Sequence, residues 1–323
     1  MFCLVSATVV IALEPNRPPP NVVSLIRQSL RVTPVSAPNV SFSLSNERVW
    51  RRERSRAQVD APIVVKIPYF ALCYGLDVVF DNRPIARFWF LESVARMPYF
   101  AYISMLHLYE SCGFRPWASA KRVHFSQEYN EYHHLLIMEA LGGSQRWGDR
   151  FLAYHSSIVY YWVLVALWLA SPSVAYKFSE LIEAHAVDTY GEFLDANEDK
   201  LRAIPAPRVA KEYYKTTLFR DFDIRQGLPD NRDCDTLYDV FANIRDDEME
   251  HVCVAAACSE TQVDPPSSSN FAAGVIPAAA LIASIAFAKY FQAADDVAIV
   301  DDALPATVFD DFLTALLNIL PFT

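Results

Sequence analysis

The sequence predicts an all-α protein, because helix-like runs of residues fill most of its length and strand-like alternation is largely missing. At 323 residues the chain is long enough for one large domain or two ordinary ones. A hydrophobic content of 53% with 20% charged residues suits a globular protein that carries an extra apolar face. We therefore expect a bundle of helices rather than a multi-span membrane protein.

The first 59 residues differ in composition from the rest of the chain. They contain eight Arg, no Lys and three Glu, with Pro18, Pro19 and Pro20 in series. We interpret residues 1–59 as a targeting segment or an unstructured leader. Since the whole chain has a net charge of −10, the remainder is strongly acidic, and this argues against nucleic acid as a partner.

An apolar stretch and a long helix are expected next. The stretch from Ala61 to Phe80 has Lys66 and Asp77 as its only charged side chains. The stretch from Arg83 to Cys112 is typical of one long helix with a kink near Pro98. A proline inside a helix removes a backbone hydrogen bond and clashes with the preceding turn, which is why a kink is expected there.

Three further helices are expected along the chain. One covers Gln127 to Leu141 and ends at Gly142-Gly143, since glycine commonly terminates helices. A second has Pro172 in its first turn and reaches to about Ala196. After an irregular polar stretch rich in Pro and Asp, Thr236 to Cys258 is helical again.

Two charge-free stretches raise the question of a membrane. The stretch from Phe151 to Tyr176 has no Asp, Glu, Lys or Arg over 26 residues, which is long enough to cross a bilayer. We expect a helix that lies in one leaflet, ahead of a buried bundle helix and of a spanning helix. Pro265 to Ala288 is also charge-free, and the choice between a lipid-facing helix and a span stays open there.

The cysteines indicate a reduced protein. They show no CxxC pair and no paired spacing, so we interpret them as scattered thiols rather than as a disulfide framework or a zinc site. The six are Cys3, Cys73, Cys112, Cys234, Cys253 and Cys258.

Two Glu-x-x-His units stand out as candidates for metal binding. They pair Glu131 with His134 and Glu248 with His251, on two separate predicted helices. Residues three apart share one face of a helix, so each unit directs a carboxylate and an imidazole at one point. A single unit is weak evidence, whereas two units on separate helices indicate a metal site.

A site for two metal ions also needs bridging carboxylates from two other helices, and the candidates are Glu92 and Glu183. Both lie in apolar or small-residue stretches, where a carboxylate without a partner is costly. The alternatives are that Glu92 pairs with Arg96 and that Glu183 pairs with Lys177 or a neighbouring helix. Four carboxylates and two imidazoles favour iron or manganese over zinc.

Three motifs around these residues are specific enough to compare with known proteins. They are Leu91-Glu92-Ser93-Val94-Ala95-Arg96-Met97-Pro98-Tyr99-Phe100, Asn130-Glu131-Tyr132-His133-His134-Leu135-Leu136 and Arg245-Asp246-Asp247-Glu248-Met249-Glu250-His251. In these motifs, and from about Pro68 to Ser259, the chain resembles the alternative oxidase family, and within it the plastid terminal oxidase branch.

The resemblance implies a ferritin-like four-helix di-iron bundle with additional apolar helices that form a monotopic membrane-facing surface. It implies an oxidoreductase that oxidises two quinols and reduces O2 to water without pumping protons, usually as a homodimer bound to membrane lipid. Two iron ions would be held by the six residues already chosen from their spacing, namely Glu92, Glu131, His134, Glu183, Glu248 and His251. The family's quinol pocket maps onto Arg87, Leu91, Thr189 and Tyr190.

Two of these residues have a plausible role in catalysis or binding and also a simpler alternative. Tyr190 lies seven residues after Glu183, two turns along the same helix face, and could donate an electron and a proton during O–O cleavage. Its alternative is a core aromatic residue. Arg87 could hydrogen-bond a quinone oxygen, or it could be a solvated helix charge.

Residues next to the ligands are expected to support them. Asp247 is expected to orient His134 or His251, as metal-bound imidazoles usually require. Three other histidines, His133, His155 and His185, are expected to be structural or to lie around the ligands rather than to bind metal.

The segment Glu183-Ala184-His185-Ala186 bears on the substrate. It is nearer to the plastid branch's Glu-Ser-His-Ala than to the Glu-Glu-Glu-Ala that is usual in mitochondrial members. We therefore expect plastoquinol as substrate and a thylakoid or other plastid membrane as the location. Ubiquinol and the mitochondrial inner membrane are the alternatives.

Two other functions compete with quinol oxidation. A di-iron membrane hydroxylase would use the same six ligands, so the metal motif does not separate it from an oxidase. An iron-storage or purely structural bundle would want a hydrophilic exterior, which the long apolar stretches do not suggest.

The expected organisation has three parts. Residues 1–59 form the leader and residues 60–262 form the di-iron quinol oxidase domain. Residues 263–323 hold an apolar helix and an acidic tail to which the sequence assigns no role.

Overall fold

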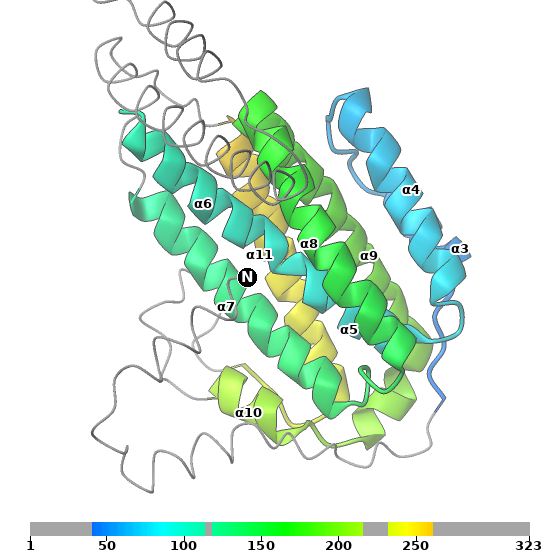
Figure 1. The fold of residues 1–323 in the computed structure, drawn as a ribbon. Helices are drawn as coiled ribbons and strands as arrows, with labels where there is room; N and C mark the ends of the chain where they lie inside the picture. Colours follow the sequence, from blue (N-terminus) through cyan, green and yellow to red (C-terminus); the bar gives the residue numbers. More distant parts are fainter. Residues whose placement is uncertain (1–40, 114–117, 216–231, 261–323) are drawn as a thin grey trace, which may run out of the picture. The chain divides into compact units, whose positions relative to one another are not determined.

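The computed structural model describes residues 41–113, 118–215 and 232–260, and within these ranges the protein is all-α (Figure 1). The chain divides into two compact units, and the larger one, Met1–Leu108 with Pro116–Val263, holds the helical bundle. Of the smaller unit, Tyr109–Arg115 with Asp264–Thr323, only residues 109–113 are described. The described helices are α3 (Asn46–Ser55), α4 (Ile63–Val79), α5 (Pro84–Ala95), α6 (Met97–Ser111), α7 (Ala118–Ala140), α8 (Trp147–Ala170), α9 (Pro172–Ala203), α10 (Arg208–Lys215) and α11 (Leu237–Glu260).

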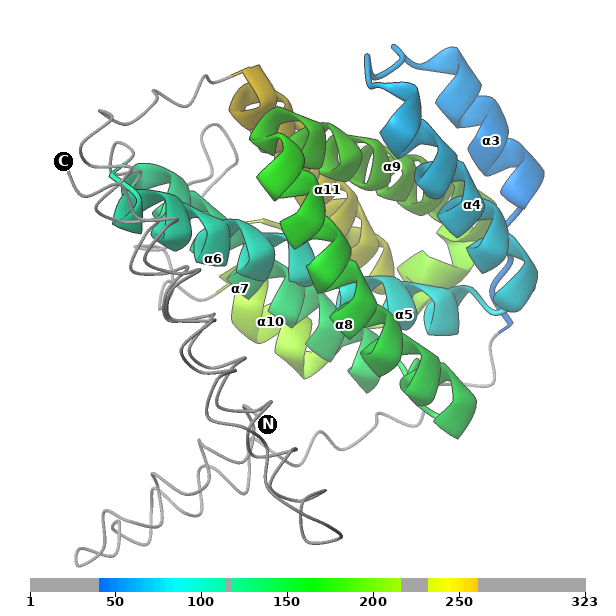
Figure 2. The same ribbon diagram turned by 45° about the horizontal axis from the view of Figure 1, so that its top comes forward.

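Four helices form the centre of the bundle. Helix α9 packs along α11, α7 contacts both α5 and α11, and the largest hydrophobic cluster draws on all four (Figures 1 and 2). Phe88, Ile137, Phe193 and Phe241, one residue from each of these helices, are fully buried in that cluster. The bundle expected from the sequence is therefore confirmed, with α5, α7, α9 and α11 as its members.

The predicted kink near Pro98 is a break between two helices. Helix α5 ends at Ala95 and α6 begins at Met97, with Arg96 between them. Pro98 has no backbone N–H to bond the carbonyl of Val94, so the first helix cannot continue through it. Figure 2 shows α6 and α5 as two helices that follow one another.

Glycines at the end of α7 allow a close approach to α5. Gly142 has a φ of 84°, and its N–H and that of Gly143 bond the carbonyls of Glu139 and Met138. A Cβ atom on Gly143 would lie 2.4 Å from the Cβ of Trp89, so a larger residue would push the helices apart. The helix begins at Ala118, nine residues before the predicted start.

Helix α9 is longer than expected. It begins at Pro172 as predicted and runs to Ala203, but Asn197 has non-helical backbone angles. The predicted end at about Ala196 therefore coincides with a kink rather than with the end of the helix. The predicted start of the last helix is close, because Thr236 caps α11 by exchanging hydrogen bonds with Asp239.

Helix α3 lies inside the stretch that was expected to be an unstructured leader. Two of its arginines, Arg48 and Arg52, and Arg56, which follows the helix, are spaced four apart, so they project from one face toward α9. The ion pairs that result are Arg48 with Glu192, Arg52 with Asp195 and Arg56 with Asp188. The leader interpretation therefore does not apply to residues 46–55, while residues 1–40 lie outside the described ranges.

Helix α8 contacts the bundle through one narrow stripe. Its buried residues recur mostly every four positions, at Asp149, Ala153, Ser157, Leu164 and Trp168, and they face α5 and α9. Most of the remaining surface is apolar and exposed. Among the described residues, α8 alone is long and apolar enough to cross a membrane, and this is weak evidence by itself.

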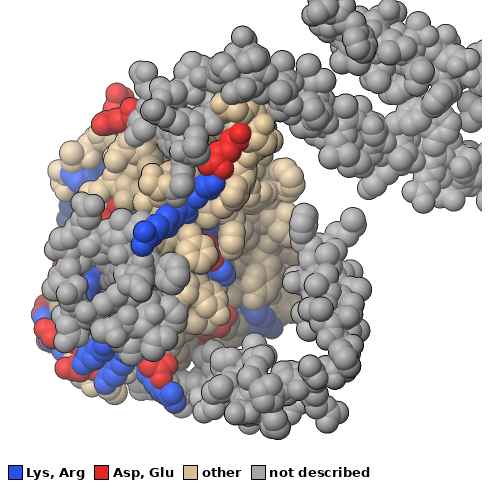
Figure 3. All heavy atoms as spheres, turned by 90° about the vertical axis from the view of Figure 1, so that its left-hand side faces the viewer, with Lys and Arg blue, Asp and Glu red and all other residues tan. Residues whose placement is uncertain are grey.

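Helix α4, like α8, has an exposed apolar surface. Seven of its large hydrophobic residues are exposed, and Val78 is the most exposed of them at 79%. The side of the molecule that carries α6, α7 and α10 looks different, because charged side chains of both signs gather toward its lower end (Figure 3). The predicted segment Pro265–Ala288 lies outside the described residues.

Candidate metal centre

The six residues predicted to bind metal converge inside the bundle. Each of the four central helices supplies its part, so residues up to 159 positions apart in the sequence meet. All six side chains are buried, with at most 4% of any residue exposed. They are Glu92 from α5, Glu131 and His134 from α7, Glu183 from α9, and Glu248 and His251 from α11.

The six residues form two overlapping groups, each with ligand atoms within 4.8 Å of one another. One group contains Glu92 and His134, the other contains Glu183 and His251, and both contain Glu131 and Glu248. The sequence suggested Glu92 and Glu183 as the bridging carboxylates, whereas the two residues common to both groups are Glu131 and Glu248. The facing helices α7 and α11 bring these two carboxylates between the imidazoles, so they are the ones that two metal ions would share.

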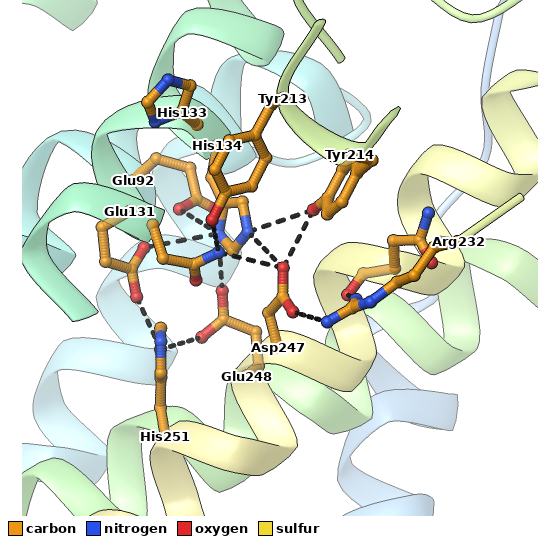
Figure 4. A network of polar contacts seen from close by, with 12 residues as sticks. Glu92, Glu131, His133, His134, Tyr213, Tyr214, Arg232, Asp247, Glu248 and His251 are labelled. Carbon is orange, nitrogen blue, oxygen red and sulfur yellow. Dashed lines mark hydrogen bonds and ion pairs between the residues drawn. The ribbon is translucent and has the colours of Figure 1, made fainter. Parts of the chain in front are cut away.

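Both imidazoles direct the same nitrogen at the carboxylates. The Nδ1 atom of His134 lies 3.3 Å from Glu248 Oε1 and 3.6 Å from Glu131 Oε2. The Nδ1 atom of His251 lies 2.9 Å from Glu131 Oε1 and 3.5 Å from Glu248 Oε2 (Figure 4). Two carboxylates thus lie between two imidazole nitrogens, an arrangement suited to a pair of metal ions.

Asp247 fixes the orientation of one imidazole. Its Oδ2 atom accepts a hydrogen bond from His134 Nε2 at 3.1 Å, which leaves Nδ1 free to bind metal (Figure 4). Asp247 is itself held by Arg232, Asn130 and Tyr214, whose donors lie 2.5 to 3.0 Å from its oxygens. The expected orienting role therefore goes to His134.

Buried polar atoms without partners show that the site fits metal ions. Among the described residues, both carboxylate oxygens of Glu131 and one oxygen each of Glu92 and Glu248 lack a hydrogen bond of normal geometry. The Nδ1 atoms of His134 and His251 also lack one, and they contact the carboxylates only as ion pairs at 2.9 to 3.6 Å. Burying so many unsatisfied atoms is costly, and metal coordination removes that cost.

The pKa values in the protein without metal support the same conclusion. Burial, followed by the charge of Glu131, raises the pKa of Glu92 well above its usual range. Burial, followed by the charge of Glu248, does the same for Glu183. Burial opposes the charged form of His134 and His251, yet the neighbouring acidic groups raise the pKa of both imidazoles. In the metal-free protein, bound protons therefore neutralise negative charge that metal cations would neutralise in the loaded protein.

Two tyrosines bond ligands across the bundle. Tyr190 on α9 donates a hydrogen bond to Glu92 on α5, and Tyr99 on α6 donates one to Glu183 on α9 at 3.2 Å. Tyr99 comes seven residues after Glu92, and Tyr190 comes seven residues after Glu183. Each tyrosine bonds the ligand that the other tyrosine follows. The spacing that identified Tyr190 would also have found Tyr99, which the sequence interpretation missed.

An apolar cavity borders the centre. Glu92, Glu183, Glu248 and Tyr190 line it together with Leu91 and hydrophobic residues of α4, α5, α8 and α9. A large apolar cavity with a few convergent polar groups is typical of a small-molecule binding site. An organic substrate in this cavity would therefore lie next to the candidate ligands.

Two residues of the expected quinol pocket are not among those that line this cavity. Arg87 is buried, and its Nη1 atom contacts Asp77 at 2.6 Å and Asn46 at 3.0 Å. Its Nε and Nη2 atoms have no hydrogen-bond partner among the described residues. Thr189 is also buried and donates to the carbonyl of His185, which does line the cavity.

The basic residues considered as alternative partners of Glu92 and Glu183 pair with other carboxylates. Arg96 pairs with Glu128 rather than with Glu92, and Lys177 pairs with Glu180 rather than with Glu183. The three histidines expected to be structural lie outside both groups of ligands. His133 and His155 bond backbone carbonyls, and His185 contacts Glu53 at 2.8 Å.

Several supporting residues were missed by the sequence interpretation. Arg232 and Tyr214 reach Asp247 from segments that carry no recognisable motif, so no local signal marks them. Asn130 directly precedes Glu131 in one of the three motifs, and that position beside a predicted ligand was the available signal.

Comparison with known proteins agrees with this geometry. The sequence model of the family described as alternative oxidase matches residues 67–260. The chain is 47% identical over 187 residues to "Ubiquinol oxidase 4, chloroplastic/chromoplastic" of Arabidopsis thaliana, covering 57% of this chain and 53% of that protein. It is 26% identical over 214 residues to "Ubiquinol oxidase 2, mitochondrial" of Glycine max, covering 66% and 57% respectively. The chain thus spans about half the length of the curated relatives it matches.

Proposed function

The chain belongs to the alternative oxidase family, and on that basis we propose that it is a plastid quinol oxidase that reduces O2 to water. The observation that carries the proposal is the convergence of six buried ligands beside an apolar cavity. The reaction consumes two quinols for each O2 and moves no charge across the membrane.

The cofactor of this reaction is a pair of iron ions. Glu131 and Glu248 would be shared between them, Glu92 and His134 would complete one position, and Glu183 and His251 would complete the other. A donor set of four carboxylates and two imidazoles is that of ferritin-like di-iron proteins. When bound, the two ions accept electrons from the quinol and pass them to O2.

Tyr190 supplies a proton, and an electron, at the edge of the cavity. Tyr190 and Glu92 both line the cavity, and the Tyr190 hydroxyl donates a hydrogen bond to Glu92. Burial, followed by the charge of Glu92, raises the pKa of this phenol well above its usual range, so the proton stays on the oxygen until it is needed. The tyrosine is therefore placed to donate hydrogen during O–O cleavage, in preference to the alternative of a purely structural aromatic.

The apolar cavity accepts the quinol head. Leu91 contributes an apolar wall, and Cys73 and Leu76 do so from α4. Arg87 and Thr189 do not line this cavity, and we keep them as proposed groups that orient a quinone oxygen at its border, where Thr189 bonds the cavity residue His185. The Nε and Nη2 atoms of Arg87, which have no hydrogen-bond partner among the described residues, support this role, because a quinone oxygen would supply the missing acceptor.

The exposed apolar faces of α4 and α8 give the quinol a route from lipid. Residues such as Ile67 and Trp162 are each 63% exposed, which is costly in water and favourable in a membrane. Since α8 keeps one buried stripe on the bundle, we propose that α4 and α8 lie in one leaflet rather than span the bilayer. The protein is then monotopic, and a homodimer is proposed on the resemblance to the family.

The proposed substrate is plastoquinol and the proposed location is the thylakoid or another plastid membrane. The support is the plastid-type segment Glu183-Ala184-His185-Ala186 and the relative named chloroplastic/chromoplastic. Because that relative is named for ubiquinol, both quinols must be compared.

Oxygen uptake by iron-loaded protein in lipid vesicles tests the proposal. We expect cyanide-insensitive uptake with decyl-plastoquinol that exceeds uptake with ubiquinol-1 and yields water. Glu183→Ala should abolish it, whereas Glu180→Ala on the same helix, which pairs with Lys177 outside the centre, should not. A hydroxylated product would instead assign the protein to the hydroxylases, and uptake that survives loss of iron would remove the metal centre from the reaction.

A further inference from the structure

A second and smaller cavity, of about 200 Å³, borders the metal centre at Glu183 and His251. Its lining differs from that of the apolar cavity, because it is rich in phenol and imidazole groups. Tyr99, His124 and Tyr176 are among the residues that line it. The proposed quinol reaction gives these buried aromatic residues no task.

Tyr176 and His124 form a hydrogen-bonded pair in this lining. The Tyr176 hydroxyl lies 2.7 Å from His124 Nε2, and His124 Nδ1 lies 3.1 Å from the side-chain oxygen of Gln127. An amide oxygen can only accept, so Nδ1 carries the hydrogen and Nε2 accepts from the phenol. Burial lowers the pKa of His124 to about 4, so the imidazole is neutral and able to take a proton.

A continuous series of rings joins this pair to a metal ligand. The ring centroids of His251 and Tyr99 are 5.6 Å apart, and those of Tyr99 and His124 are 6.2 Å apart. The centroids of His124 and Tyr176 are again 5.6 Å apart. Rings packed this closely allow an electron to pass from Tyr176 toward the centre in short steps.

The far end of the series reaches a thiol near the surface. The hydroxyl of Ser173 at the start of α9 donates to the carbonyl of Ser259 on α11 at 2.7 Å, which brings the end of α11, with Cys258, beside the first turns of α9, with Tyr176. The two side chains interact electrostatically, and Cys258 is partly exposed. Burial raises the pKa of this thiol, so it holds its hydrogen at neutral pH. Cys253, on the same helix, is more exposed and provides a natural comparison.

We propose that Tyr176, paired with His124, is a redox relay that carries an oxidising equivalent from the metal centre to Cys258. The inference rests on the proposed oxidase function, which supplies the oxidant, namely the iron centre after it has reacted with O2. One electron leaves Tyr176 and reduces the centre by one electron, and the phenol proton moves to His124 Nε2. The tyrosyl radical then takes an electron from the Cys258 thiol, whose proton is released while His124 returns its proton to the phenolate.

The sulfur radical that results is repaired by a soluble thiol, which gives up a hydrogen atom and restores the S–H group of Cys258. Electrons and protons therefore balance at each step. The relay acts when the centre has reacted with O2 and quinol is scarce. It lets the oxidising equivalent leave along Tyr176 instead of attacking the ligands, and it is separate from Tyr190, which serves the quinol-fed reaction beside Glu92.

Radical trapping tests the relay without measuring turnover. Iron-loaded protein is chemically reduced, freed of reductant, and mixed with O2 and the spin trap DMPO in the absence of quinol and soluble thiol. Tandem mass spectrometry then locates the adducts. We expect an adduct on Cys258 in the wild type, its loss in Tyr176→Phe, and its retention in Tyr74→Phe, which removes a hydroxyl that lies far along the chain on α4. Equal iron content and helicity in the three proteins exclude misfolding.

Cys253 in the same samples separates the relay from diffusing oxidants, since peroxide in solution would attack the more exposed thiol. Adduct on Cys253 at the level of Cys258, or an adduct on Cys258 that Tyr176→Phe leaves unchanged, would overturn the relay. Rapid freezing gives a second readout, because Cys258→Ser should prolong a tyrosyl radical signal that Tyr176→Phe removes. If the same wild-type preparation oxidises decyl-plastoquinol but forms no adduct, the relay alone fails. If iron-loaded protein consumes no O2, the proposed function fails and the relay with it.

Discussion

Tyr190 on α9 donates a hydrogen bond to Glu92 on α5, so a tyrosine from one ligand-bearing helix is tied to the ligand of another. Tyr99 repeats the relationship in the other direction by bonding Glu183. These contacts cross the bundle at the point where the ligands meet. They connect the candidate centre to the cavity through Tyr190, which lines that cavity.

Removing the Tyr190 hydroxyl should slow the reaction without emptying the site. Tyr190→Phe keeps the ring that stacks on Phe88 at 4.3 Å but loses the donor to Glu92. We expect unchanged iron content and a fall in the rate of quinol oxidation of roughly 10²-fold or more, as is usual when a proton donor is lost. Oxygen-electrode assays of Tyr190→Phe beside Tyr74→Phe check this, and near wild-type rates in Tyr190→Phe would make the residue structural.

The overlap between the two ligand groups predicts different iron contents in two variants. Glu131→Ala removes a carboxylate that belongs to both groups and should leave the protein without iron. Glu183→Ala removes a carboxylate that belongs only to the group with His251. We therefore expect about one iron ion to remain, beside Glu92 and His134. Metal analysis with circular dichroism measures both, and equal iron loss in the two variants would contradict the shared role of Glu131.

Asp247 should control iron affinity through His134. Asp247→Asn keeps the shape of the side chain but weakens the charge that holds the imidazole and Arg232. Losing such a partner typically costs about 10- to 100-fold in metal affinity. Asp246→Asn is the matched control, because the neighbouring Asp246 pairs with Arg245 at the surface. Competition with an iron chelator measures the difference, and equal affinities would remove Asp247 from the site.

Acid should destabilise the metal-free protein partly through His124. Burial lowers its pKa from 6.5 to about 4, so the unfolded chain binds more protons between those values than the folded one. The free energy of unfolding must then fall as the pH drops from 6.5 to 4, by at most roughly 3 kcal/mol for this group. Urea titrations at several pH values should show a shallower acid dependence in His124→Asn than in the wild type. Parallel curves would mean that His124 is charged in the folded protein.

The ligands could be predicted from the sequence because each helix encodes its own part of the site. The Glu-x-x-His spacing fixes which face of α7 and α11 carries the chemistry, and Glu92 and Glu183 are unusual in apolar surroundings. Which carboxylates lie in the middle depends instead on how the helices pack. The sequence therefore suggested Glu92 and Glu183 for the bridging role, while the packing places Glu131 and Glu248 in both groups of ligands.

The fold shows the same division between local and long-range information. Pro98, Gly142 and Pro172 end or begin helices through their own backbone chemistry, so the breaks near them were predictable. Helix α3 was not, because its arginines find their acidic partners more than 130 residues away on α9. Arg232 is equally hidden, since only the folded chain brings it to Asp247.

Two iron ions should lie among these six side chains. Crystals of the iron-loaded protein, measured on both sides of the iron absorption edge, would locate them. We predict two anomalous peaks, one beside Glu92 and His134 and one beside Glu183 and His251, with Glu131 and Glu248 between them. A single peak, or iron bound anywhere outside this cluster, would contradict this prediction.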